Sequence, residues 1–211
     1  MQPDEYFRFN CSKCGDCCRN VGNSIMAESL DLYRLAHFFK MEMSEVITQY
    51  TDVAFLAPQF PVFMLKTTPP GDACVFLKES RCSVQDAKPR ACRLYPLGVG
   101  SDEDNSGEWI HFIVSKKQHH FTGQQRLAGK WVNKNLTPED YAFVNADYAY
   151  TGELARLMRN INSRNDEKIL ELILFWKFVS YDISENFMPQ YTSNMEQLKK
   201  RLAKLSKEHQ P

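Results

Sequence analysis

Cysteines are the residues of this chain whose type and spacing most clearly offer chemistry. Seven occur among 211 residues, and none follows Cys92. Thiolates bind zinc and iron–sulfur clusters. An odd count in a chain without a recognisable secretory leader fits a disulfide framework poorly. The sequence therefore predicts a metal centre, and its candidate ligands are Cys11, Cys14, Cys17, Cys18, Cys74, Cys82 and Cys92.

The tightest pattern is the run Cys11-x-x-Cys14-x-x-Cys17-Cys18. A two-residue gap lets a tight turn bring two sulfurs onto one ion or onto neighbouring irons, and Gly15 supplies a permissive residue for that turn. Adjacent cysteines cannot easily aim at one point from regular backbone. Either the chain bends sharply at Cys17 and Cys18, or the pair serves two nearby sites. The spacing excludes the two-cluster ferredoxin run and the radical-SAM triad.

The remaining cysteines lie in two short segments. Residues 74–77 and 82–84 read as strands of a hairpin joined by a polar turn at 78–81, so that Cys74 and Cys82 reach a common centre from its base. Cys92 follows in a segment that Pro89 and Pro96 bracket.

The cysteine count bears on the identity of the metal. Seven sulfurs do not fill two closed four-cysteine zinc sites, and a single zinc would leave three thiols idle. One [4Fe–4S] cluster, with a second ion or with three structural thiols, uses the count better. We therefore favour an iron–sulfur cluster, and zinc remains the alternative.

These motifs carry a family resemblance. The run from Cys11 to Cys18, the Cys-x-Phe-Leu segment at 74–77 with its paired Cys82, and Cys-Arg-x-Tyr-Pro at 92–96 resemble the YkgJ-like cysteine-cluster (CxxCxxCC) family, described as zinc- or iron-chelating. The resemblance covers residues 9–97. One departure is Lys88, where the family usually has arginine before the proline.

More distantly, the same region resembles the cysteine-rich part of the flagellin lysine methylases. That resemblance implies an iron–sulfur cluster, S-adenosylmethionine as a cofactor and a peptide or protein substrate. The candidate cofactor-binding residues are Arg90, Arg93 and Tyr95. The two guanidinium groups would alternatively offset the negative charge of a thiolate centre, and Tyr95 would be a packed ring. We assign no catalytic residue, since no nucleophile–base pair stands out.

Apolar periodicity predicts the elements that position these residues. We expect helices at 28–40 and 44–50, strands at 62–66 and 108–114, and a helix that begins at Thr137 and Pro138. Residues 169–179 read as a helix buried on most sides. Capping-box spacing occurs at 163–166 and 193–196, and the last helix has an apolar stripe. His119 and His120 are expected in a solvated loop.

The predicted fold is α+β, with a small irregular cysteine-bound module and its β-hairpin (9–97) packed on a mainly helical C-terminal half (120–208). We expect one compact domain over residues 1–211. The 26 basic and 26 acidic side chains cancel, so neither nucleic acid nor a membrane is an expected partner. We also expect no membrane span and a cytoplasmic location.

Two functions follow. The first is an iron–sulfur enzyme that modifies a peptide or protein, in the manner of a methyltransferase. The second is a non-enzymatic metal module: an electron carrier, a metal chelator or a zinc-stapled interaction domain.

Overall fold

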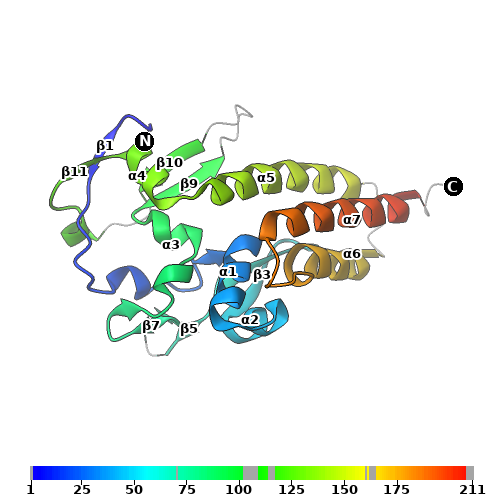
Figure 1. Cartoon of the computed structure of the whole chain (residues 1–211), viewed down its shortest axis with the longest axis horizontal. Coiled ribbons are helices and arrows are strands. Elements are labelled where there is room, and N and C mark those ends of the chain that lie inside the picture. Colours follow the sequence, from blue (N-terminus) through cyan, green and yellow to red (C-terminus); the bar gives the residue numbers. More distant parts are fainter. Residues whose placement is uncertain are drawn as a thin grey trace.

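The computed structural model describes residues 2–69, 71–101, 109–113, 117–159, 161 and 165–207. The fold is α+β, as predicted. Short strands and loops make up the cysteine-bearing part, and helices extend side by side away from it (Figure 1). No helix in the described ranges is both long and apolar enough to cross a membrane.

The strands form small antiparallel sheets. The largest has the order β2 (Met26–Ala27), β4 (Phe60–Leu65) and β3 (Thr51–Ala57). The two-stranded sheets pair β1 (Tyr6–Arg8) with β11 (Gln125–Leu127), β5 (Thr67–Thr68) with β6 (Ala73–Cys74), β7 (Leu77–Lys78) with β8 (Arg81–Cys82), and β9 (Leu97–Ser101) with β10 (Trp109–Ile113). Along β4 burial alternates, because successive side chains point to opposite faces. Phe63 and Leu65 thus enter the core.

The helices follow the predicted periodicity at most places. They are α1 (Ser29–Phe39), α2 (Met43–Tyr50), α3 (Arg90–Leu94), α4 (Ala128–Asn135), α5 (Pro138–Met158), α6 (Asp166–Ile173) and α7 (Phe187–Lys207). The short turns are η1 (Asp16–Cys18), η2 (Gln85–Ala87), η3 (Gln118–His120) and the π-helical segment η5 (Leu174–Val179). The start of α5 is as predicted: the Thr137 side chain accepts a hydrogen bond from the backbone N–H of Asp140, and Pro138 occupies the first turn.

The apolar stripe of the last helix packs on its neighbours. Met195, Leu198, Leu202 and Leu205 are all buried in α7. This helix lies against α5, where the rings of Phe143 and Tyr191 meet at 5.1 Å between centroids.

The hairpin around the second group of cysteines differs from the prediction. Leu77 pairs with Cys82 across a two-residue turn, whereas Cys74 pairs with Thr67 in another sheet. Glu79 and Ser80 have φ values of 47° and 62°. Positive φ at both central residues is the geometry of a tight hairpin turn, which sets the register with Leu77 opposite Cys82.

Two predictions in the helical half were wrong. The capping-box spacing at 193–196 lies inside α7, which begins at Phe187. The run 169–179 changes from α-helix to π-helix at Leu174, and Phe175 is 48% exposed. The spacing at 163–166 falls largely outside the described residues.

Within the described ranges, the buried side chains form two cores. The larger includes Cys18 and Leu32 and extends to Leu198 in α7. The smaller comprises Phe7, Phe9, Leu94, Leu97, Ala128, Val132 and Leu136. Because Phe9 belongs to one core and Cys18 to the other, the segment with the first four cysteines joins them.

Candidate metal centre

A glycine turn shapes the first cysteine run. Gly15 has φ 76°, in the left-handed region, and the Cys18 N–H donates to its carbonyl oxygen at 2.9 Å. A Cβ on Gly15 would lie 2.9 Å from the carbonyl oxygen of Ser80. The loop therefore lies directly against the β7–β8 turn, which brings Cys17 and Cys18 to the side of the hairpin that carries Cys82.

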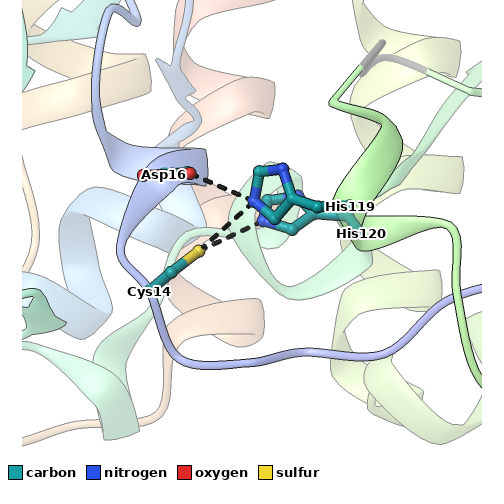
Figure 2. A group of neighbouring side chains, drawn as sticks. All are labelled: Cys14, Asp16, His119 and His120. Carbon is teal, nitrogen blue, oxygen red and sulfur yellow. Dashed lines mark hydrogen bonds and ion pairs between the residues drawn. The ribbon is translucent and has the colours of Figure 1, made fainter.

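One group of side chains has the composition of a metal site. Cys14, Asp16, His119 and His120, here called the mixed quartet, place one ligand atom each within 4.8 Å of one another. Cys14 Sγ lies 3.2 Å from His120 Nε2 and 3.8 Å from His119 Nε2, and His119 Nε2 lies 3.1 Å from Asp16 Oδ2. In Figure 2 the two histidines reach across from η3 to the cysteine loop.

His120 is held in a fixed orientation. It is 3% exposed, and its ring packs edge-on against those of Phe9 and Tyr95, at 6.2 and 5.6 Å between centroids. Its Nδ1 shares a hydrogen bond with Tyr95 Oη at 2.7 Å. With one ring nitrogen occupied in this way, the other faces Cys14.

Local hydrogen bonds favour the thiolate of Cys14. The hydroxyl of Ser12 and then the ring of His120 lower the pKa of the Cys14 thiol from 9.0 to about 6. The Lys117 ammonium donates to the backbone oxygen of Asp16 and ties the loop to the segment before η3. A thiolate is the form of cysteine that binds metal.

The other thiols form a second group. A set of neighbouring thiols is here called the thiol group, because the charges of its members raise the pKa values of Cys18, Cys74 and Cys92. Its members are Cys17, Cys18, Cys74, Cys82 and Cys92. Cys17 Sγ and Cys18 Sγ are 3.8 Å apart.

The close confinement of these sulfurs shifts their pKa values. The hydrogen bond from Cys18 lowers the pKa of Cys17 to about 6, whereas the same bond, burial and the nearby thiolates raise the pKa of Cys18. Burial and neighbouring cysteines also raise the pKa values of Cys74 and Cys92. A full set of thiolates needs a positive partner, which a metal centre supplies.

An open pocket of about 340 Å³ connects the two groups. Its wall includes Cys11, Cys14, Cys17, Cys18 and Cys82, the basic residues Lys13, Arg81 and Lys88, and the rings of Tyr95 and His120. All seven cysteines are free, and Cys11 is exposed. The structure thus brings five predicted ligands into one group, places Cys14 in the other and leaves Cys11 in the pocket wall. That all seven bind metal stays a prediction.

The predicted cofactor-binding arginines contact carboxylates of this chain. Arg90 donates two hydrogen bonds to Glu28, both at 2.8 Å. Arg93 donates to both carboxylate oxygens of Asp140, at 2.8 and 2.6 Å. Tyr95 contacts His120 within the pocket wall. A cofactor contact by Arg90, Arg93 or Tyr95 stays a prediction.

His119 and His120 are site residues that the sequence pattern did not identify. A solvated loop was the wrong prediction for His120, which is buried, whereas the side chain of His119 is 52% exposed. In the tight turn η3 the two rings lie 4.1 Å apart between centroids, although side chains of adjacent residues point apart in regular strands and helices. The available signal was the pairing itself, in a chain with five histidines.

The comparisons with known proteins agree with this donor chemistry. Residues 10–119, just over half of the chain, match the family model CxxCxxCC, whose description is "Putative zinc- or iron-chelating domain". No curated protein and no solved structure shows a match.

Proposed function

The chain belongs to the CxxCxxCC family and is a metal-binding protein of the zinc- or iron-chelating class, and on that premise we propose that its thiol group carries an iron–sulfur cluster. The donors fit such a cluster, because each iron of a [4Fe–4S] core takes one thiolate and the thiol group offers five sulfurs. They come from separate parts of the chain: the cysteine loop, the strands β6 and β8, and helix α3.

The observation that carries the proposal is the thiol-lined pocket. A single zinc ion touches all its ligands and needs no space between them, and structural zinc sites are closed. A core of four irons and four sulfides needs space of its own. The pocket of about 340 Å³, with Cys17, Cys18 and Cys82 in its wall, supplies that space beside the buried thiols.

Basic side chains support the same reading. The charge of Lys88 contributes to the lowered pKa of Cys17 and offsets part of the rise that burial causes in the pKa of Cys92, and Lys88 also lines the pocket. A cluster bound by four thiolates carries net negative charge, which nearby cations and hydrogen bonds stabilise. Such a cluster supplies electron transfer or, where an iron has an open position, a site for an external ligand. S-adenosylmethionine and a peptide or protein substrate stay predictions from the methylase resemblance.

One distance favours the alternative, a zinc site. Zinc–sulfur bonds of about 2.3 Å place two sulfurs about 3.8 Å apart at the corners of a tetrahedron. The Cys17–Cys18 separation of 3.8 Å equals that edge. In that case the thiol group is a structural or chelating module without a reaction.

Elemental analysis separates the two candidates. We expect the full chain, purified without oxygen, to be brown and to contain about four irons and four labile sulfides. A colourless protein with zinc and no sulfide, which also fails to take up iron and sulfide on reconstitution, would sink the iron–sulfur proposal.

A double variant tests the assignment to the thiol group. Cys17→Ser with Cys82→Ser removes two partly exposed thiols of five and leaves fewer than a four-cysteine cluster needs. We expect it to lose the sulfide and the visible absorption. The matched control is Cys11→Ser, at an exposed cysteine outside the group. Loss of the cluster in the control, with retention in the double variant, would contradict the assignment.

A further inference from the structure

We propose that the mixed quartet is a second metal site, which binds one divalent ion of the zinc or ferrous class separately from the thiol group. Bonds of about 2.0 to 2.3 Å place the ligand atoms of a tetrahedral ion about 3.3 to 3.8 Å apart. Cys14 Sγ lies 3.8 Å from His119 Nε2, within this range, and 3.2 Å from His120 Nε2. His119 Nε2 and Asp16 Oδ2 are 3.1 Å apart, so two of the three pairs are a few tenths of an ångström closer than the bonded geometry and would move apart slightly around an ion.

The donor set has intermediate softness. One thiolate, two imidazoles and one carboxylate are ligands that zinc and ferrous iron accept, whereas magnesium and calcium prefer oxygen alone. The two anionic ligands, Cys14 and Asp16, also balance the charge of a divalent ion. Four ligands complete a tetrahedral shell without any sulfur of the thiol group.

Tyr95 holds one ligand in the orientation that a metal requires. Histidines that bind metal usually have their second ring nitrogen in a hydrogen bond, which fixes the tautomer and the ring. The Tyr95 hydroxyl forms that bond with His120 Nδ1 at 2.7 Å. Since His120 is 3% exposed and packs on Phe9, its ring has little freedom to turn away.

The opposite side of the site is also fixed before an ion binds. The left-handed Gly15 lies between Cys14 and Asp16, so its turn sets the relative position of these two ligands. Lys117, two residues before His119, donates to the backbone of Asp16. Figure 2 shows the segment with Cys14 and Asp16 and the segment with His119 and His120 meeting at the site from different parts of the fold.

The ion would be exchangeable with solvent. The side chains of His119 and Asp16 are 52% and 35% exposed, and Cys14 and His120 line the open pocket. The site therefore lies at the edge of the pocket, partly open to solvent and beside the thiol group.

Cobalt(II) is the probe for this site, because it replaces zinc and a cobalt–thiolate bond absorbs light. The full chain, isolated without oxygen, is titrated with Co(II) and then with zinc as the competitor. We expect the parent protein to bind one more equivalent of Co(II), with thiolate absorption, than a protein that lacks the mixed quartet. Cys14→Ser should lose that absorption, and His119→Ala should weaken binding at least tenfold. The control is His37→Ala, at an exposed histidine of α1, which should bind as the parent does.

Tyr95→Phe tests the positioning role. The ring stays and the hydroxyl goes, so we expect 10- to 100-fold weaker Co(II) binding, while the thiolate absorption persists at saturation. Far-ultraviolet circular dichroism confirms that each variant is folded. Unchanged affinity in Tyr95→Phe would show that the hydroxyl does not position His120.

Iron and sulfide contents separate this proposal from the cluster proposal. Cys14→Ser should lose one bound Co(II) and keep whatever the thiol group holds. If Cys14→Ser and His119→Ala bind Co(II) as the parent does, the second site does not exist. If Cys14→Ser instead loses sulfide, Cys14 is a cluster ligand and the separate site is overturned. If the parent protein contains no sulfide, the thiol group also binds Co(II), and the loss of one equivalent in Cys14→Ser relative to the parent still identifies the second site.

Discussion

At the scale of single residues, Asp140 joins three parts of the fold. Its side chain is 1% exposed and accepts hydrogen bonds from Arg93 in α3 and from Arg34 in α1. It also accepts from the backbone N–H of Thr137 at the start of α5. Burial alone would raise the pKa of this carboxyl, but the hydrogen bonds from Arg93, Thr137 and Arg34 hold it far below its usual range.

Asp140→Asn should therefore destabilise the protein. Breaking a buried ion pair leaves unpaired charge, and we expect a loss of about 3 kcal/mol in the free energy of unfolding at pH 7. Because the folded pKa lies below the unfolded value of about 3.9, the contribution is present above about pH 4 and is lost as the pH falls further. Urea unfolding of both proteins at pH 7 and pH 3.5 measures the difference between their free energies of unfolding. This difference should be smaller at pH 3.5.

The control is Asp52→Asn, at an exposed position of β3. We expect it to change the free energy of unfolding by less than about 0.5 kcal/mol. A gap between parent and Asp140→Asn that does not depend on pH would contradict the charge argument.

Residue type was enough to predict the cysteines as candidate metal ligands, because cysteines confined to one half of a chain are seldom only small apolar side chains of the core. It was not enough for the mixed quartet. Cys14 and His120 are 106 positions apart, and only the packing of η3 against the cysteine loop brings them together. Likewise, nothing near Arg93 in the sequence identifies Asp140 as its partner.

At the scale of elements, the turn at Gly15 decides where the cysteine loop lies. Its left-handed backbone and its close approach to Ser80 leave no room for a side chain. The same loop continues into η1, which places Cys17 and Cys18 beside the other members of the thiol group. Both candidate sites thus depend on one backbone conformation.

Gly15→Ala should disturb both sites. An alanine in the left-handed region costs about 1 to 2 kcal/mol, and its Cβ would also contact the Ser80 carbonyl oxygen at 2.9 Å. We expect lower stability and lower metal content, measured by urea unfolding and elemental analysis. The matched control is Gly152→Ala inside α5, where the nearest atom is the end of the Arg156 side chain. There alanine should stabilise by about 0.5 to 1 kcal/mol. Full metal content in Gly15→Ala would show that the loop can shift without loss of either site.

Elements with strong local signals were predictable. Apolar periodicity located α1 and α2, and the capping threonine with proline located the start of α5. The register of the hairpin was not predictable at this level, because the left-handed pair at 79–80 is not glycine or asparagine. The π-helical segment η5 has no sequence signal that distinguishes it from an α-helix.

At the scale of the whole molecule, the cysteine loop is one of the segments that connect the two cores, beside helices α3 and α5. Phe9 packs in the smaller core with Trp131, and Cys18 packs in the larger one. The mixed quartet lies along the same connection, since His120 also packs on Phe9. Metal bound there would hold the two cores together.

Metal removal should therefore loosen the molecule unevenly. After chelation we expect faster hydrogen exchange at residues 9–20 and 118–127, while the buried amides of α5 and α7 stay protected. Mass spectrometry of peptides from the parent protein before and after chelation measures this, and return of zinc or iron should restore protection. Equal loss of protection in α7 would mean that the metal supports the whole fold.

The larger core contains residues from both sides of position 119, where the match to the family model ends. Tyr33 of α1 donates to the carbonyl oxygen of Ile183 at 3.3 Å, and its ring lies 5.2 Å from that of Phe187. Phe63 of β4 meets Phe178 at 4.8 Å between centroids. A chain cut after residue 119 would leave these apolar side chains in water and would also lack His120. The boundary of sequence similarity is thus not a boundary of folding, and the region with the metal ligands should be produced together with its helices.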